Sequence, residues 1–321
     1  MSGTGTIAAR VKRLDNAGED ILRVVLKPEG ADRFPGWAPG AHIDLVLPIA
    51  AGDGEPVVRQ YSLCSDPQDL SEYQIAVLRD PNSRGGSSWI HDQLKEGGPI
   101  TIGMPRNHFP FQPGQRTLFI AGGIGITPIL PMARQAEAEG RDWRMVVAVR
   151  SRQRLPLGDD LAGLPQERIH YHFDEEAGLL DLASLLAPVG SETIVYSCGP
   201  KPLLNALQER NSGAPWQFRF ERFAAEPVVT GGNRPFDIIC RSSGKRLHVP
   251  ADKSILQVLR EAGIKVESSC RDGVCGTCEV RVLSGTPEHR DSVLTPEERE
   301  EGGYMMVCVS RAVSDVLELD I

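Results

Sequence analysis

Three cysteines, Cys270, Cys275 and Cys278, lie close together in the stretch CRDGVCGTC, and a fourth, Cys308, lies near the end of the chain. This C-x4-C-x2-C spacing followed by one distant cysteine is typical of a plant-type [2Fe–2S] centre. Two irons and two bridging sulfides need four thiolates around a small object, and one tight loop can supply three of them. The spacing therefore predicts that all four cysteines bind an iron–sulfur cluster.

Zinc is the alternative metal for these thiols. Structural zinc sites commonly use paired C-x2-C knuckles, and only Cys275 and Cys278 form one here. A zinc-stabilised binding module would also leave the glycine-rich and arginine-containing motifs upstream without a role. The sequence therefore favours the iron–sulfur centre.

The sequence around the cysteines predicts short strands and two capped helices. We expect a hairpin over PFDIICRSSGKRLHVP, a helix from Ser254 to about Ala262, and a strand over CEVRVLSG. A further short helix should have Thr295 as its N-cap and Pro296 as its first residue. From about residue 233 to 321 this pattern resembles the plant-type ferredoxin module, a β-grasp fold.

A glycine turn between a strand and a helix occurs in LFIAGGIGITPILPM. The apolar strand ends at Ala121, and a helix ending near Gly140 should follow, with Thr127 as N-cap and Pro128 at the first position. Backbone N–H groups at such a turn, together with the helix dipole, form an anion site. The third glycine of the usual G-x-G-x-x-G pattern is missing, so this is not the Rossmann fingerprint.

A second turn of the same kind follows the strand ETIVYSC, at Cys198, Gly199 and Pro200. The strands WRMVVAVR, IHYHF and ETIVYSC alternate with helical stretches, which predicts a parallel α/β sheet. Ligands bind at the carboxyl ends of such strands, where both turns lie.

An arginine and a tyrosine share one strand face in RQYSLCSDP, because side chains two residues apart point the same way. Alternating strands with glycine and proline turns around this stretch predict a small β-barrel. The Arg59 guanidinium can donate two parallel hydrogen bonds to a phosphate, and Tyr61 has a flat aromatic ring with a polar hydroxyl group. The simpler alternative makes Tyr61 a core aromatic and Arg84, in SRGGSS, a solvated turn residue.

The order of these motifs along nearly the whole chain resembles the phthalate dioxygenase reductase family, and within it the reductases of the vanillate O-demethylase type. The resemblance implies a multidomain chain with a flavin-binding β-barrel, an α/β nucleotide-binding domain of the ferredoxin-reductase type and a C-terminal β-grasp ferredoxin. The implied boundaries are an FMN domain at 1–110, an NAD domain at 111–224, a linker at 225–232 and a [2Fe–2S] domain at 233–321.

The resemblance also implies roles for individual residues. The FMN phosphate would lie against Arg59 and the SRGGSS turn, which contains Arg84. Tyr61 would lie beside the isoalloxazine ring of the flavin, and Ser62 would lie near its N5 atom. One glycine turn would line the nucleotide diphosphate groove, and the other would lie near the nicotinamide. These residues are Arg59, Tyr61, Ser62, Arg84, Gly85, Gly86 and Ser87 for FMN, Gly123, Gly125 and Thr127 for the diphosphate, and Cys198, Gly199, Pro200, Glu221 and Phe223 around the nicotinamide.

The activity implied by the resemblance is electron transfer from NADH through FMN and the [2Fe–2S] cluster to a terminal oxygenase. A hydride carries two electrons and the cluster accepts one, and a flavin can handle both kinds of transfer. We expect the partner to be a Rieske-type oxygenase or O-demethylase of aromatic degradation. The alternatives are a reductase for a cytochrome P450 and a stand-alone NAD(P)H-dependent flavin or dye reductase.

The choice between NADH and NADPH rests on conflicting residues. Arg150 and Arg152 follow the strand WRMVVAVR without an acid, which favours NADPH. Asp174, Glu175 and Glu176 follow the next strand and would repel a 2′-phosphate. We predict NADH, with Asp174 as the acid on the ribose side.

The overall composition excludes several classes of protein. The chain has 321 residues, 40% of them hydrophobic, and a net charge of −8, which argues against a nucleic-acid partner. Neither a signal peptide nor an apolar run of membrane-spanning length is evident, so we expect a monomeric cytoplasmic protein without a membrane partner. Seven cysteines in such a chain indicate metal or redox chemistry more often than disulfides.

Overall fold

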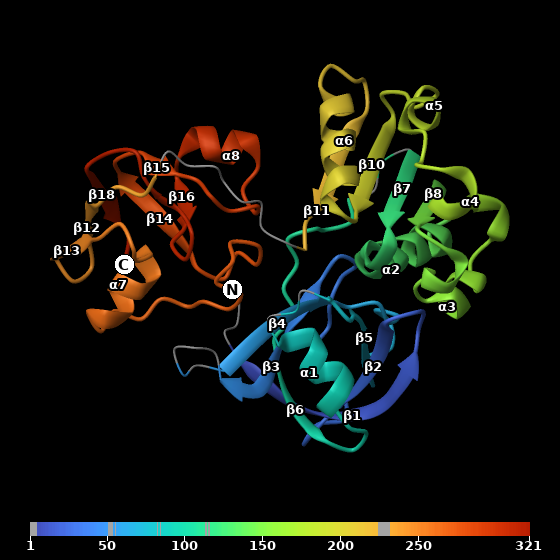
Figure 1. Ribbon diagram of the computed structural model, residues 1–321, viewed down its shortest axis with the longest axis horizontal. Helices are drawn as coiled ribbons and strands as arrows, with labels where there is room; N and C mark the ends of the chain where they lie inside the picture. Colours follow the sequence, from blue (N-terminus) through green and yellow to red (C-terminus); the bar gives the residue numbers. More distant parts are fainter. Residues whose placement is uncertain are drawn as a thin grey trace. The chain divides into compact units, whose positions relative to one another are not determined.

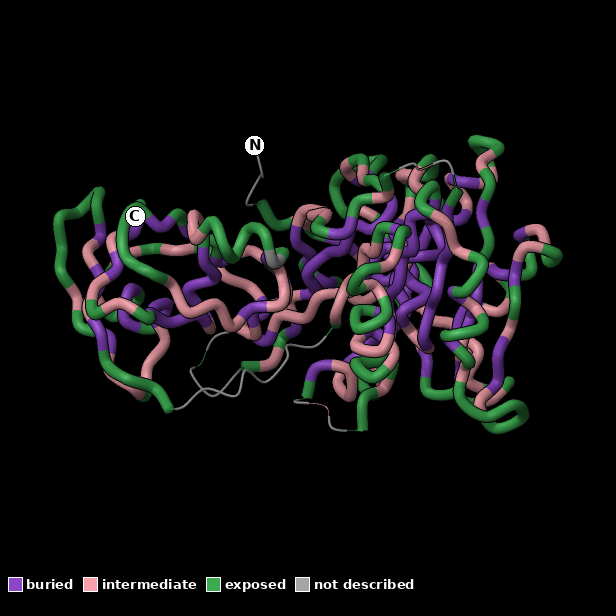
Figure 2. Tube along the Cα trace, turned by 90° about the horizontal axis from the view of Figure 1, so that it is seen from above, coloured by how far each residue is buried: buried purple, intermediate pink, exposed green. Residues whose placement is uncertain are grey.

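The computed structural model describes residues 5–321 except 51–53, 55, 82, 84, 113, 115 and 224–231. The chain forms two compact units, Met1–Glu221 and Arg222–Ile321. In Figure 1 the first unit runs from blue to yellow and the second from orange to red. In Figure 2 the buried segments run through the interior of each unit, and exposed segments are mainly the turns between elements.

The first half of the first unit is an antiparallel sheet that curls into a barrel, as predicted. Its strand order is β4-β3-β6-β1-β2-β5. The edge strands are brought together beyond β4, where Cys64 N donates to Gln74 O at 2.9 Å. Alternate residues of the strands fill the barrel, Ile43, Leu45 and Leu47 of β3 among them. The elements are β1 (Thr6–Asn16), β2 (Ile21–Pro28), β3 (His42–Ala50), β4 (Pro56–Ser62), β5 (Tyr73–Leu78), α1 (Gly86–Gln93) and β6 (Pro99–Gly103).

The second half of the first unit is a five-stranded sheet whose strands all run parallel, again as predicted. Its order is β11-β10-β7-β8-β9. The strands are β7 (Arg116–Gly122), β8 (Asp142–Val149), β9 (Ile169–Phe173), β10 (Thr193–Cys198) and β11 (Gln217–Glu221). The helices are α2 (Ile126–Ala138), α3 (Gly158–Ala162), α4 (Asp174–Ala177), α5 (Leu182–Leu186) and α6 (Lys201–Asn211).

Helices cover both faces of this sheet because the central strands are apolar on both sides. On β7, Phe119 belongs to the same buried cluster as the apolar face of α2. Its neighbours Leu118 and Ile120 point the other way and join the cluster that includes residues of α5 and α6. This arrangement leaves the carboxyl ends of the strands for ligand binding.

The second unit is a mixed five-stranded sheet, β13-β12-β18-β14-β16, beside two short helices. The predicted cap Thr295 is confirmed, and Ser254, predicted as the first residue of its helix, is also a cap: each accepts a hydrogen bond from the third residue of the helix that follows, in complete capping boxes. The elements are β12 (Phe236–Cys240), β13 (Lys245–Val249), α7 (Ile255–Glu261), β14 (Glu279–Ser284), β15 (Pro287–Glu288), α8 (Pro296–Glu301), β16 (Tyr304–Met306), β17 (Arg311–Ala312) and β18 (Val316–Leu319).

One predicted cap is wrong. A 3-10 turn over Gly123–Gly125 leads directly into α2, so Gly125 caps the helix and Thr127 lies inside its first turn. The Thr127 hydroxyl instead donates to Ile124 O at 3.0 Å. Pro128 is tolerated because the N–H groups of the first turn have no partner within the helix.

The predicted domain boundaries can be compared with the two compact units. The expected boundary between residues 110 and 111 lies inside the first unit, between β6 and β7. The expected linker, 225–232, lies almost entirely outside the described residues.

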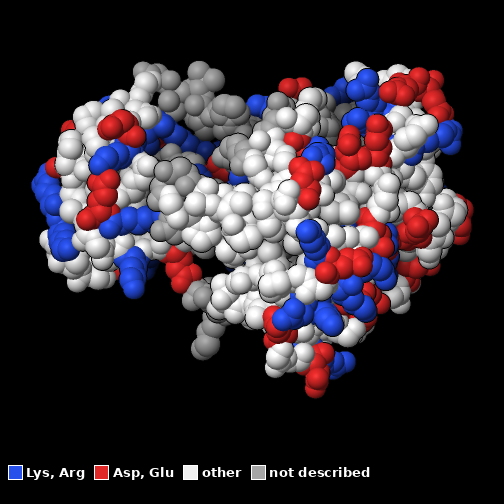
Figure 3. Space-filling model, turned by 60° about the horizontal axis from the view of Figure 1, so that its bottom comes forward, with Lys and Arg blue, Asp and Glu red and all other residues white. Residues whose placement is uncertain are grey.

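In the part of the chain that the structure describes, no helix is both long enough and apolar enough to cross a membrane. On the face drawn in Figure 3, acidic and basic side chains are intermingled.

Candidate functional site

The four cysteines of the second unit form two contacting pairs of buried, unoxidised thiols. Within the first pair, Cys270 donates to Cys275, which lowers the pKa of Cys275 to about 6 and raises that of Cys270. In the second pair, Cys308 donates to Cys278, with the same consequence for the two pKa values. In each pair the sulfur that accepts the hydrogen bond has the lowered pKa, which favours the thiolate, the form that binds metal.

Backbone and hydroxyl groups surround these sulfurs with hydrogen-bond donors. Asp272 N donates to Cys270 Sγ at 3.3 Å, and Thr277 Oγ1 lies 3.2 Å from Cys275 Sγ. Gly273 N donates to Cys308 in the second pair. Donors of this kind stabilise the negative charge of thiolate ligands.

The paired arrangement fits a binuclear cluster, in which each iron takes two protein thiolates. Within the described ranges, no three His, Cys, Asp or Glu side chains gather as a site for a single metal ion. The residues present thus match the donor set of a [2Fe–2S] centre: four sulfurs in two pairs.

A buried carboxylate that the sequence reasoning did not single out supports the cysteine loop. The Asp291 side chain is fully buried and accepts hydrogen bonds from Val293 N at 3.1 Å and Leu294 N at 2.9 Å. The adjacent Ser292 N donates to Gly273 O at 2.8 Å, which fixes the residue that donates to Cys308. The local signal was the sequence DSVL, since an aspartate often accepts from N–H groups two and three residues later.

In the barrel, β4 brings Arg59 against the first turn of α1. A Cβ placed on Gly86 would lie 2.7 Å from both Cγ and Nε of Arg59, so only glycine leaves room for this side chain. A guanidinium beside a helix N-terminus forms an anion site, which fits the phosphate of a flavin mononucleotide. Gly85, in a left-handed conformation, caps α1, and the Ser87 hydroxyl accepts a hydrogen bond from Asp80 N at 3.2 Å.

Tyr61 lies two residues beyond Arg59 on the same strand and packs partly against the barrel core. Burial raises its pKa and the Arg59 charge opposes this effect, so the two side chains are neighbours. Ser62 is buried and pairs in register with His42 of β3, whose pKa burial lowers to about 3. Of the predicted flavin residues, Arg84 alone lies outside the described residues.

The two predicted glycine turns lie side by side. Strand β10 pairs with β7, with Cys198 opposite Ala121. A Cβ on Gly125 would lie 2.2 Å from Cys198 O, so this close approach of two backbones requires glycine. On the other side, a Cβ on Gly122 would lie 2.5 Å from the Pro200 ring. The Gly123–Gly125 turn and the Cys198-Gly199-Pro200 turn thus lie against each other at the carboxyl end of the sheet.

Cys198 and Glu221 lie opposite each other in register at the carboxyl ends of β10 and β11. Burial, and secondly the nearby Glu221, raises the pKa of Cys198 well above its ordinary value. Burial likewise raises the pKa of Glu221 from 4.5 to about 8, and its Oε2 is buried with no hydrogen-bond partner among the described residues. An unpartnered buried oxygen at a strand end suits a site that a ligand completes. Phe223, two residues further, is 44% exposed.

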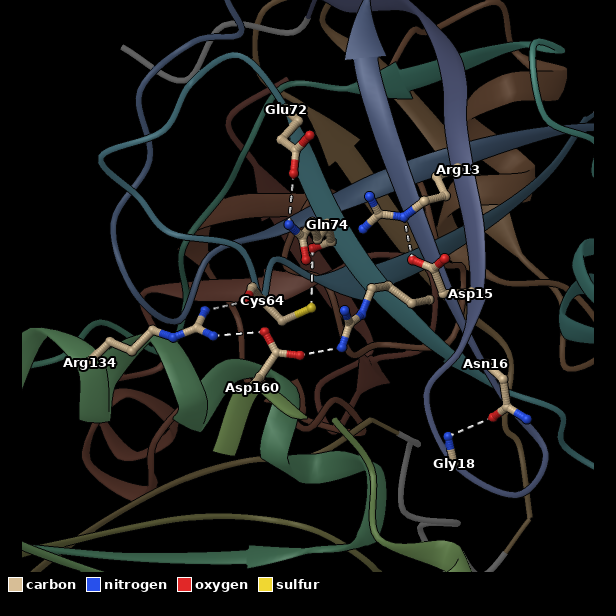
Figure 4. Close-up of polar contacts among 10 residues, drawn as sticks. Arg13, Asp15, Asn16, Gly18, Cys64, Glu72, Gln74, Arg134 and Asp160 are labelled. Atoms are coloured by element: carbon tan, nitrogen blue, oxygen red, sulfur yellow. Dashed lines mark hydrogen bonds and ion pairs between the residues drawn. The ribbon is translucent and has the colours of Figure 1, made fainter. Parts of the chain in front are cut away.

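An ion network that sequence reasoning missed joins the barrel to the nucleotide-binding half (Figure 4). Arg134 of α2 donates to Cys64 O at 3.1 Å and to Asp160 Oδ1 at 2.8 Å. The other oxygen of Asp160 accepts from Arg23 of β2. Because Cys64 lies two residues after the end of β4 at Ser62, Arg134 connects the segment that follows β4 to α2.

The charged residues predicted to face the ribose lie at the ends of β8 and β9. Asp174 begins α4, and its carboxylate lies 3.4 Å from His172 Nε2. Arg150 and Arg152 follow β8 and contact Glu175 and Glu176. The structure therefore brings all of the competing ribose-side candidates together.

Comparison with known proteins extends these observations to nearly the whole chain. Residues 238–313 match the family model of the 2Fe-2S iron-sulfur cluster binding domain. The chain is 41% identical over 292 residues to a vanillate O-demethylase oxidoreductase of Pseudomonas putida, covering 89% of this chain and 90% of that protein.

Solved structures also resemble nearly the whole chain, and two of them are informative here. One is phthalate dioxygenase reductase, described as a modular structure for electron transfer from pyridine nucleotides to [2Fe–2S]: it is 34% identical, with a TM-score of 0.70, and the match covers 99% of this chain and 98% of that one. The other is an intact type IV self-sufficient cytochrome P450 monooxygenase, 41% identical, with a TM-score of 0.89. That match covers 98% of this chain, which spans only 41% of the monooxygenase.

Proposed function

Because this chain belongs to the phthalate dioxygenase reductase family of iron–sulfur flavoproteins, we propose that it passes electrons from NADH, by way of FMN and a [2Fe–2S] cluster, to a Rieske-type terminal oxygenase. The chain is an oxidoreductase, the reductase component of an oxygenase system. The substrate belongs to the oxygenase, and the vanillate and phthalate systems of the relatives favour an aromatic acid.

The observation that carries this proposal is the convergence of four buried thiols in two pairs. Cys270, Cys275, Cys278 and Cys308 would hold the cluster, two to each iron. The backbone donors around them favour the thiolate form, and burial excludes water from the sulfurs. An iron–sulfur module of this kind would allow a flavin-binding chain to pass electrons to another protein.

The residues of the first unit would hold and orient the two nucleotides. When bound, flavin accepts a hydride and releases its electrons singly, which is the chemistry that a one-electron centre requires. Arg59 and the start of α1, with Gly85, Gly86 and Ser87, would bind the FMN phosphate. Tyr61 would flank the ring, and Ser62 would lie near N5.

The end of the parallel sheet would bind the electron donor. Gly123, Gly125 and Thr127 would line the diphosphate groove, with the N-terminus of α2 facing the negative charge. Cys198, beside Gly199 and Pro200, would lie near the nicotinamide, and Glu221 and Phe223 would close its far side. Burial raises the pKa of both Cys198 and Glu221, which favours the uncharged forms of these side chains at this end of the site.

A cytochrome P450 is the second candidate for the electron acceptor. The specific observation in its favour is the match of 98% of this chain to part of a self-sufficient P450 monooxygenase. Against it stand the relatives of similar length, which are named as reductases of dioxygenase and demethylase systems.

Cofactor analysis of the purified protein tests the proposal. We expect chromatography of the released flavin and analysis of iron and acid-labile sulfide to give about one FMN, two irons and two sulfides per chain. NADH-driven reduction of an added Rieske-type oxygenase should then exceed reduction of an added P450. Bound zinc without flavin would refute the proposed function, and preferential P450 reduction would refute the proposed partner.

A further inference from the structure

The residues directly after β8 correspond, by analogy, to those that read the ribose in the βαβ unit of a dinucleotide-binding fold, although the G-x-G-x-x-G fingerprint of that unit is absent here. In such units the diphosphate binds at the turn after the first strand, and the residues after the second strand meet the adenosine ribose. Here the first strand is β7, with its glycine turn, and β8 pairs with it so that Ala148 lies opposite Gly122. Arg150 and Arg152 therefore lie just beyond the level of the diphosphate turn. Arginines at this position ordinarily bind the 2′-phosphate of NADPH.

In this chain a neighbouring turn brings acids onto those arginines. Glu175 N donates to Arg150 O at 3.0 Å, which fixes the start of α4 against the end of β8. The Glu175 carboxylate accepts from Arg150 Nε at 3.1 Å. Glu176 accepts from Arg152 Nε at 2.6 Å and from its Nη2 at 2.8 Å, a bidentate pair. The Arg152 guanidinium also lies over the Phe173 ring, 4.4 Å from its centroid.

The charges of this cluster do not favour a phosphate. Arg150 and Arg152 pair with Glu175 and Glu176, and Asp174 begins the same turn, so these five side chains carry a net formal charge of −1. A phosphate monoester carries roughly −1.5 to −2 charges at neutral pH. The cluster would repel it, whereas the uncharged 2′-hydroxyl of NADH meets no such barrier.

We propose that Glu175 and Glu176 make the site selective for NADH by neutralising Arg150 and Arg152. This inference rests on the proposed function and identifies the residues that would determine the preference of the reductase for NADH over NADPH. The ion pairs are largely exposed, and such pairs are weak. The negative charge of the two carboxylates, and not the strength of their ion pairs, therefore disfavours NADPH. Removing both carboxylates should leave Arg150 and Arg152 able to bind the 2′-phosphate.

The test is the double variant Glu175→Gln/Glu176→Gln in the holoenzyme. Glutamine keeps the size and an acceptor oxygen while removing both charges. We expect kcat/KM for NADPH, measured by dye reduction, to rise about tenfold or more, the effect of gaining a charge-assisted phosphate contact. The value for NADH should change less than about threefold. Inhibition by 2′,5′-ADP should tighten in parallel while inhibition by 5′-AMP stays constant, which reads nucleotide binding independently of electron transfer.

Two controls isolate the mechanism. Asp174→Asn removes one charge from the same turn without releasing an arginine, so the gain in kcat/KM for NADPH should be smaller than in the double variant. Adding Arg150→Gln and Arg152→Gln to the double variant should abolish its gain. In the parent, raising the ionic strength should narrow the difference between the two nucleotides, because salt screens exposed charges.

The outcomes separate this inference from the proposed function. A parent that reduces dyes with neither nucleotide would refute the function. A parent that prefers NADPH, or a double variant whose NADPH kinetics and 2′,5′-ADP inhibition equal those of the parent, would overturn the inference while leaving the reductase activity in place.

Discussion

The contact between the two glycine turns predicts a large effect for a single methyl group. In Gly125→Ala the new Cβ would lie 2.2 Å from Cys198 O, 2.4 Å from Cys198 C and 2.7 Å from Gly199 N. All three atoms belong to the backbone, so no side-chain rotation can relieve the clash. Strand β10 is held to β7 in register up to Cys198, and the two turns can separate only by distorting the ends of these strands.

The size of the effect follows from that geometry. Real Cβ atoms do not approach other heavy atoms closer than 3.0 Å, so the contact at 2.2 Å must open by about 0.8 Å. Overpacking of this kind costs about 1–3 kcal/mol of stability. A displacement near 1 Å at a site that orients a reacting ring can cost about 100-fold in rate. We therefore expect kcat/KM for NADH to fall between about 10-fold and 100-fold.

Dye reduction under steady-state conditions measures the effect, and visible absorption verifies that flavin and cluster are retained. Gly158→Ala is the matched control, because its Cβ would meet only the Leu155 side chain at 3.7 Å, an ordinary contact, at the start of α3. A Gly125→Ala enzyme with the kcat/KM of the parent would refute the assignment of this turn to the nucleotide site.

Three further substitutions test other parts of the site. Cys275→Ser should abolish the [2Fe–2S] electron paramagnetic resonance signal of the dithionite-reduced protein while NADH-dependent dye reduction continues; a full signal would exclude Cys275 as a ligand. Arg59→Ala should weaken FMN binding by about tenfold or more, measured by fluorescence titration of the flavin-free protein, and an unchanged affinity would remove Arg59 from the phosphate site. Because the pKa of Glu221 is raised from 4.5 to about 8 in the folded protein, the protonated form stabilises the fold, and the free energy of unfolding should fall as the pH rises between these values. Glu221→Gln should flatten that dependence in urea titrations, and equal slopes in the two proteins would contradict the burial of a protonated Glu221.

Local signals were sufficient for much of the fold. Ser254 and Thr295 each have an acceptor side chain and a Gln or Glu three residues later; both begin helices close to where they were predicted, and Thr295 is the cap that was predicted. Thr127 failed as a cap because the glycines before it can adopt a 3-10 turn that extends the helix toward its start. The side-chain type predicted a cap, but the backbone freedom of its neighbours decided where the helix began.

The contacts that organise the site could not be predicted, because they join residues far apart in sequence. Arg134 meets Cys64 across 70 positions, and Arg23 meets Asp160 across 137. No periodicity or spacing indicates which acid faces which arginine. The same holds for the ribose side, where the sequence offered three acids and two arginines and only the fold shows which ones pair.

Anaerobic titration of the purified protein with NADH, followed by visible absorption and electron paramagnetic resonance, tests the central claim most directly. A flavin that takes two electrons and a cluster that takes one should consume roughly 1.5 equivalents of NADH per chain. The fully reduced protein should then show a [2Fe–2S] signal, which Cys275→Ser should lack. Bleaching of the flavin alone, with no iron–sulfur signal in the parent at any NADH concentration, would contradict the proposed path of electrons.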